Sequence, residues 1–124
     1  MTSLLVPDYD EAIVFFRDAL NFVVEEDRDL GSGKRWVVMA GASGGKLLLA
    51  RATSDEQRAV IGNQSGGRVG WFLASHDFDT DRRRMTEWGV QFTEEPRHEA
   101  YGTVAVFKDP WGNRWDLIEH RKAA

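Results

Sequence analysis

The sequence predicts an α+β fold built from two βαβββ modules, because the chain repeats itself. Residues 38–49 align with residues 106–117 at an offset of 68, and residues 8–10 align with residues 77–79 at an offset of 69. Apolar alternation typical of strands lies on both sides of the glycine-containing turn in each copy. Two turns can resemble each other by chance, but the segments between the two aligned stretches also agree in the kind of secondary structure they predict. We therefore interpret the repeat as a duplicated module of about 55 residues.

The first module is expected at about residues 1–51. A short strand ends at Pro7, and Asp8 with Glu11 three residues later predicts a capped helix start. The helix carries apolar residues at one face, which predicts packing on a sheet rather than an aromatic ligand platform. These residues are Ala12, Phe15, Phe16, Ala19 and Leu20. The expected strands of this module are 3–6, 22–30, 34–40 and 46–51, with turns at 31–33 and 41–45.

A linker at about residues 52–67 separates the modules. It contains an expected helix at 52–61, capped by Ser54, and a glycine-rich boundary at 62–67. The second module, at about 68–120, repeats the order of the first. Its expected strands are 69–75, 90–93, 103–107 and 114–119, and residues 94–101 are expected to form a polar loop or strand extension. Its helix begins after Asp77 and is expected to place Phe78, Met85 and Trp88 inward and Arg82, Arg83 and Arg84 toward water.

The segment Asp109-Pro110-Trp111-Gly112-Asn113 predicts the turn of the last hairpin. Pro110 presets φ near −65°, and Gly112 or Asn113 can adopt a positive φ. Trp111 in this turn is expected to be exposed or to contact a second subunit.

Length and composition limit the class of protein. A chain of 124 residues predicts a single domain, residues 1–124, with one core. The chain has no cysteine, so disulfides and thiolate ligands are excluded. No apolar run is long enough for a membrane helix and the start lacks a signal-peptide pattern, so we expect a cytoplasmic protein without a membrane partner. The net charge of −4 disfavours nucleic acid as a partner.

Residues 6–16, together with Tyr101-Gly102 and the segment 109–113, resemble the vicinal oxygen chelate superfamily. This is the family of glyoxalase I, bleomycin resistance proteins and extradiol dioxygenases. The resemblance covers nearly the whole chain. It implies eight-stranded, incompletely closed barrel-like sheets around a cavity, with helices on the outer face, usually within a homodimer.

Metal-dependent members of that family carry a His in the first strand of each module and a carboxylate in the last. The positions that match in this chain are Met1, Gly70, Leu48 and Asp116, of which only Asp116 is a metal donor. Open catalytic metal sites use about three protein ligands. His76, His98 and His120 show no paired-ligand spacing. We therefore expect no metal, no cofactor and no catalytic residues. Whether the natural chain begins before Met1 stays open.

The resemblance also implies which residues face the cavity. If Gly70, Leu48 and Asp116 occupy ligand-equivalent positions, strand alternation places Phe72 and Arg114 on the same side. The expected ligand-binding residues are Trp36, Leu48, Gly70, Phe72, Tyr101, Arg114 and Asp116. Two alternatives stay open: Asp116 forms a structural ion pair with Arg114, or Gly70 only makes room for an aromatic neighbour.

A small-molecule-binding protein of this superfamily, without a catalytic metal, is the leading hypothesis. An antibiotic-sequestering protein of the bleomycin type is the second. A metal-dependent lyase, isomerase or dioxygenase is the third, so whether the protein is an enzyme stays open. An interaction module with a filled cavity is the fourth.

Overall fold

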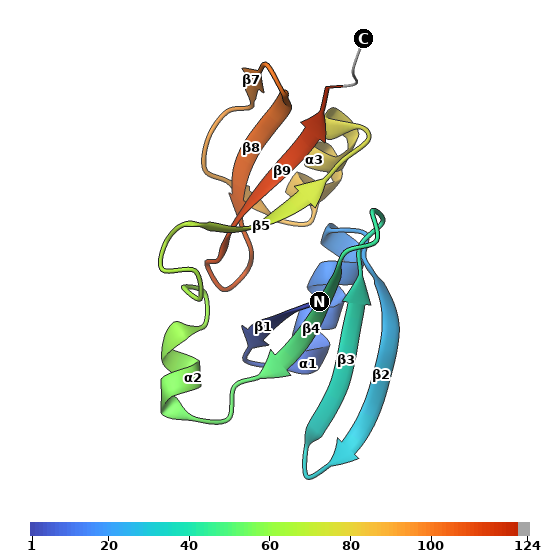
Figure 1. Ribbon diagram of the computed structural model, residues 1–124, viewed down its shortest axis with the longest axis vertical. Coiled ribbons are helices and arrows are strands. Elements are labelled where there is room, and N and C mark those ends of the chain that lie inside the picture. The colour runs from blue at the N-terminus through green and yellow to red at the C-terminus, as the bar shows by residue number, and fades with distance from the viewer. Residues whose placement is uncertain (122–124) are drawn as a thin grey trace. The chain divides into compact units, whose positions relative to one another are not determined.

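The computed structural model describes residues 1–121, and the chain divides into two compact units, Met1–Gln64 and Ser65–Ala124. Unit 1 contains a four-stranded sheet and unit 2 a five-stranded sheet, each with a helix against one face (Figure 1). The predicted α+β class is confirmed. Neither sheet closes into a barrel within the described residues.

Unit 1 follows the predicted βαβββ order. Its elements are β1 (Thr2–Val6), α1 (Tyr9–Val14), the π-helical turn η1 (Phe15–Ala19), β2 (Val23–Gly31), β3 (Lys34–Ala40), β4 (Lys46–Arg51) and α2 (Asp55–Val60). The strand order is β1-β4-β3-β2, with β1 parallel to β4 and the other pairs antiparallel.

Helix α1 begins where the sequence predicted. The Asp8 carboxylate accepts a hydrogen bond from the Glu11 N–H at 2.8 Å. The apolar stripe packs on the sheet: Phe16 is fully buried, and Phe15, only partly buried, meets it edge-on at 5.2 Å between ring centroids. Helical bonding changes to the π type at Phe15, and this side chain lies at the edge of the buried stripe.

Unit 2 repeats the order with one additional short strand. Its elements are β5 (Val69–Ala74), α3 (Phe78–Glu87), β6 (Gln91–Phe92), β7 (Arg97–Glu99), β8 (Gly102–Lys108) and β9 (Arg114–His120). The strand order is β5-β9-β8-β6, and β7 pairs with β8. The Glu119 carboxylate of β9 accepts the Phe78 N–H at 2.7 Å, so the start of α3 is bonded to its own sheet.

Two expectations for unit 2 are corrected by the structure. Phe78 and Met85 are buried as predicted, but the Trp88 side chain is 57% exposed. Trp88 caps the end of α3, and Gly89, at φ 84°, turns the chain away before the ring can reach the sheet. The apolar residues on both faces of the strand at 69–75 also predict that both faces are covered, yet Phe72 is 66% exposed.

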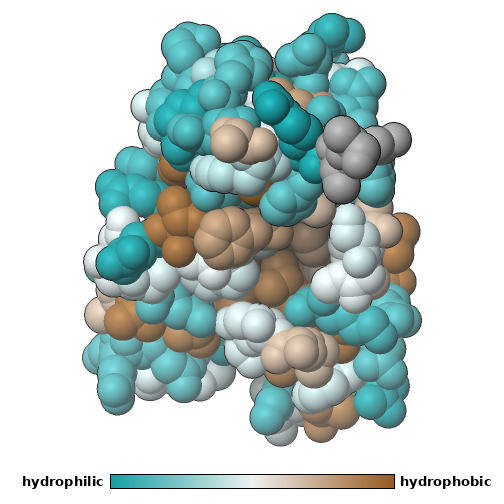
Figure 2. All heavy atoms as spheres, turned by 45° about the horizontal axis from the view of Figure 1, so that its top comes forward, coloured by the Kyte–Doolittle hydropathy of each residue, from teal (hydrophilic) through white to brown (hydrophobic). Residues whose placement is uncertain are grey.

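The surface mixes polar and apolar side chains. Figure 2 shows hydrophobic side chains lying among hydrophilic ones on the face in view. The large exposed hydrophobic side chains include Val23, Leu30, Phe72, Trp88 and Tyr101. No helix within residues 1–121 combines the length and apolarity needed to cross a membrane.

Candidate functional site

The turn between β8 and β9 fixes the start of the strand that carries Arg114 and Asp116. The Asp109 side chain, only 4% exposed, accepts the N–H groups of Trp111, Gly112 and Asn113 at 2.9–3.1 Å. It also accepts Nδ2 of Asn113 at 2.8 Å and the indole Nε1 of Trp115 at 3.2 Å. Burial raises the pKa of Asp109, and these donors oppose that shift. The turn is therefore built around one carboxylate.

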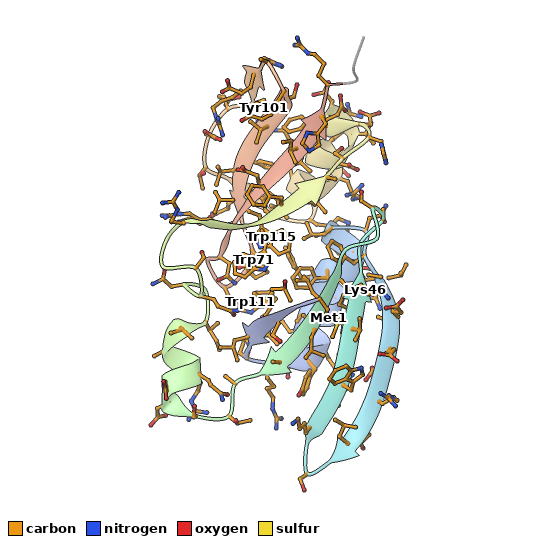
Figure 3. All side chains as sticks on the ribbon, viewed as in Figure 1. Met1, Lys46, Trp71, Tyr101, Trp111 and Trp115 are labelled. Carbon is orange, nitrogen blue, oxygen red and sulfur yellow. The ribbon has the colours of Figure 1, made fainter. Side chains whose placement is uncertain are left out.

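An aromatic row crosses the helix-covered face of the unit 2 sheet. Trp71 stacks on Trp115 at 5.7 Å, Trp115 on Phe107 at 5.8 Å, and Phe107 lies 5.7 Å from Phe92. These residues are cross-strand partners in register, so one layer of rings joins β5, β9, β8 and β6. In Figure 3, Trp71, Trp111 and Trp115 gather at the same end of unit 2. The residues that alternate with this row along β5 and β9 therefore lie on the opposite face of the sheet.

That opposite face brings Phe72 and Asp116 together. The two residues are register partners on β5 and β9, and Asp116 also lies opposite Val106 on β8. Oδ1 of Asp116 is buried and has no hydrogen-bond partner among the described residues. Burial raises the pKa of Asp116; Arg97 lowers it and Glu94 raises it further. The face therefore combines an exposed aromatic ring with a carboxylate oxygen that lacks a donor.

The other predicted residues of unit 2 lie apart from this pair. The Arg114 guanidinium donates to the carbonyl of Gly67, and no ion pair joins it to Asp116 within residues 1–121. A Cβ on Gly70 would lie 2.9 Å from Cβ of Ser65, so the Ser65 side chain fills the space beside Gly70. Tyr101, 51% exposed, immediately precedes β8, about 17 Å along the chain from the partner of Asp116.

In unit 1, the structure brings Trp36 and Leu48 together in one pocket of about 480 Å³. The pocket lies where the β2–β3 turn meets the end of β4 and the segment leading into α2. The Trp36 indole N–H donates to Glu26 at 2.7 Å. The lining residues are Leu5, Tyr9, Leu30, Ser32, Lys34, Arg35, Trp36, Leu48, Leu49, Ala50, Arg51, Thr53 and Gln57.

The basic and phenolic residues of this pocket were not singled out from the sequence. Lys34 begins β3 and Arg51 ends β4, and these strands are antiparallel neighbours. Their expected pairing places both residues at the same end of the sheet, so the signal was present in the strand boundaries.

The residues at the metal-ligand positions that the resemblance implies do not fit a metal ion. Leu48 and Gly70 offer no donor atom, and Asp116 is a single carboxylate. In the part of the chain that the structure describes, no three His, Asp or Glu side chains form a group able to hold a metal. His76 and His120 line a separate hollow of about 440 Å³ with Ser75 and Glu119. Nδ1 of His98 lies 3.3 Å from the Thr103 hydroxyl.

Protein relatives extend over almost the full chain. An uncharacterised protein of Shewanella frigidimarina is 48% identical over 120 residues, covering 94% of this chain and 89% of the relative. The protein YurT of Bacillus subtilis is 30% identical and covers 96% of both chains.

Solved structures match the fold. UcmS2 is 25% identical with a TM-score of 0.78, covering 94% of this chain and 93% of that one. TnmS3 of Streptomyces sp. CB03234, described as an antibiotic binding protein, is 25% identical with a TM-score of 0.69, covering 96% and 93%. The family model of the Glyoxalase/Bleomycin resistance protein/Dioxygenase superfamily matches residues 1–117. The duplicated βαβββ order, the paired glycine turns and these matches agree, and the chain belongs to this superfamily.

Proposed function

We propose that the protein binds a small organic molecule and needs no catalytic metal to do so. The observation that carries this proposal is the pair formed by Phe72 and Asp116. An exposed ring on a sheet face provides apolar contact, and a buried carboxylate oxygen without a donor provides one directional anchor. The preferred ligand therefore has an apolar or aromatic body and an N–H or O–H donor for Asp116.

The residue chemistry supports a site that works without a metal. Glyoxalase-type isomerisation and extradiol cleavage use a metal ion to polarise or activate oxygen. If Leu48 and Gly70 occupy two of the ligand positions, as the resemblance implies, they leave Asp116 without other metal donors there. Asp116 is thereby available as a hydrogen-bond acceptor for an organic ligand.

The wider ligand set and the assembly remain predictions. We propose, from the family resemblance, that Trp36, Leu48, Gly70, Tyr101 and Arg114 also contact the ligand. We also propose that residues 1–124 act as one domain of two modules. The eight-stranded barrel-like arrangement around a cavity, the homodimer and the cytoplasmic location are predictions from the family resemblance.

Antibiotic sequestration is the second candidate function. Similarity to TnmS3, an antibiotic binding protein, favours it. This function predicts that cells overproducing the protein tolerate higher concentrations of the sequestered drug. Unchanged drug sensitivity across bleomycin and other aromatic antibiotics would count against it.

Calorimetric titration tests the main proposal. The probes are bleomycin and a panel of aromatic amines, titrated into wild-type protein and the Asp116→Asn and Phe72→Ala variants. We expect at least one probe to bind, and both variants to weaken it by about tenfold. Asp55→Asn, an exposed carboxylate on α2, is the matched control and should leave the affinity unchanged.

Metal analysis separates the binding function from the third candidate, a metal-dependent lyase, isomerase or dioxygenase. The protein is purified without chelator or tag and incubated with Zn²⁺, Ni²⁺, Mn²⁺ or Fe²⁺ before plasma mass spectrometry. We expect less than a tenth of an equivalent to be retained. Retention of about one equivalent per chain would overturn the metal-independent proposal.

A further inference from the structure

The unit 1 pocket has a cationic rim that the proposed function does not use. We propose that this pocket binds an organic anion with an apolar or aromatic body and a carboxylate or phosphate head. Arg51 and Lys34 bind the head, and the apolar wall receives the body. The inference rests on unit 1 alone and not on Asp116 or Phe72.

Two guanidinium groups flank the ring of Tyr9. Cζ of Arg35 lies 5.2 Å and Cζ of Arg51 lies 5.7 Å from the ring centroid. Tyr9 is buried, and its hydroxyl oxygen accepts a hydrogen bond from the backbone N–H of Arg35 at 3.2 Å. A phenol that accepts still has a proton to donate. Two cations and a hydroxyl donor are thus held in place beside the pocket.

The charges of these cations are balanced unequally. Arg35 is bound by Asp27 at 2.7 Å and by Asp10 at 2.9 Å, which raises the pKa of Arg35. Arg51 and Lys34 form no ion pair in the described residues, and no carboxylate lines the pocket. An anion is therefore the ligand that would complete the charge balance of this pocket.

The β2–β3 turn leaves space for the Arg51 head group. Gly33 has a φ of 80°, and a Cβ at this position would lie 3.0 Å from a terminal nitrogen of Arg51. The guanidinium thus lies against Gly33, where the turn has no side chain. Its planar fork can present two parallel N–H donors to an oxyacid head.

The rest of the pocket suits an apolar body. Leu5, Leu48 and Ala50 come from the open face of the sheet, and the Trp36 ring lies beside them. The volume of about 480 Å³ lies within the range usual for small-molecule sites. An inorganic anion would leave this wall unused, so the site favours an anion with an attached apolar group.

Nuclear magnetic resonance titration tests the site, because Trp36 is the only tryptophan of unit 1. The probes are 1-naphthoate, 1-naphthyl phosphate and the neutral 1-naphthamide, followed through the indole N–H signal of Trp36. We expect at least one anion to shift this signal saturably and to bind about tenfold more tightly than the amide. The two anions distinguish a carboxylate site from a phosphate site.

Variants then locate the charge that binds the head. Arg51→Gln should weaken the anion by about tenfold and Lys34→Gln by less, since Lys34 is exposed. Neither should change the affinity of the amide. The control Arg58→Gln alters an exposed arginine of α2 that pairs with Asp55 outside the pocket. A Trp36 signal that no anion moves, or equal affinity of anion and amide for the wild type, would overturn the proposal, as would an Arg51→Gln variant with undiminished anion affinity.

Discussion

The two hairpin turns share one backbone and differ in what stabilises it. In unit 1 the Gly41 N–H donates to the Gly45 carbonyl at 2.8 Å, and in unit 2 the Asp109 N–H donates to the Asn113 carbonyl at 3.0 Å. The fourth residue of each turn donates back to the first, and both are glycines with φ of 95° and 108°. Only the second turn has a carboxylate at its centre.

The turn motif has two roles, which are to set the path of the backbone and to hold the turn against the sheet. A positive φ at the fourth position determines the path of the turn, and glycine alone satisfies it in both copies. The Asp109 side chain adds five accepted hydrogen bonds and reaches the Trp115 indole, so it joins the turn to the aromatic row. Unit 2 therefore holds the start of β9 more firmly than unit 1 holds the start of β4.

Removal of the carboxylate should have the largest effect. Asp109→Ala leaves the donors of a buried turn without their acceptor, and we expect a loss of about 2–4 kcal/mol in the free energy of unfolding. Urea denaturation measures it. Asp55→Ala, a fully exposed aspartate, is the control and should change stability by less than about 0.5 kcal/mol. A loss at Asp109 as small as at Asp55 would refute the central role of this side chain.

The next largest loss of stability is expected at Gly102, where the two modules differ, because the equivalent residue in unit 1 is Lys34. A Cβ at Gly102 would lie 2.1 Å from the backbone oxygen of Glu119, and its φ is 151°. Gly102→Ala should therefore cost about 2–3 kcal/mol, because β9 itself must move. Lys34→Ala at the matching place in β3 should be nearly neutral. Equal stability of the two variants in thermal unfolding would show that β9 adapts freely.

The repeat made most of the fold predictable from the sequence. Gly44 and Gly112 mark turns because few other residues adopt a positive φ, and the Asp8 and Asp77 caps are local features. Trp88 was misplaced because the hydrophobic period continues through the sequence while the helix stops. Gly89, a residue type that commonly follows the end of a helix, is the signal in the sequence that the helix stops there.

The site was only partly predictable for a different reason. Alternation along β9 places Asp116 and Trp115 on opposite faces, as the aromatic row and the register show. The environment of Gly70 depends on Ser65 in the linker and on a register shift between Val69 and Trp71, which no period in the sequence reveals. The cationic pocket joins three segments far apart in the chain, and the pairings of β4 with β3 and with β1 bring them together.

Transfer of the second turn's polar residues to the first should sharpen the comparison with a smaller, stabilising effect. At Gly41 a Cβ would lie in ordinary contact at 3.4 Å from the Phe22 ring, and at Gly45 it would meet nothing within 4 Å. The double variant Gly41→Asp with Gly45→Asn should gain about 0.5–1.5 kcal/mol from new turn hydrogen bonds and a less flexible unfolded chain. Gly45→Asn alone supplies the control. No gain in urea denaturation would mean that the carboxylate needs the indole of Trp115.

The smallest effect concerns Asp116, whose pKa is raised by burial as that of Asp109 is, but without donors to compensate. A carboxyl with a pKa higher in the folded than in the unfolded state binds more protons when folded. The contribution of Asp116 to the free energy of unfolding therefore falls as the pH rises from the ordinary pKa of 3.8 through the raised pKa. Above the raised pKa the contribution stays at its lowered value. Asp116→Asn removes the charge and should gain up to about 1 kcal/mol near pH 7, with the gain shrinking toward pH 4. Thermal unfolding of both proteins across this pH range measures the difference, and a gain independent of pH would show that the charge of Asp116 carries no cost in the fold.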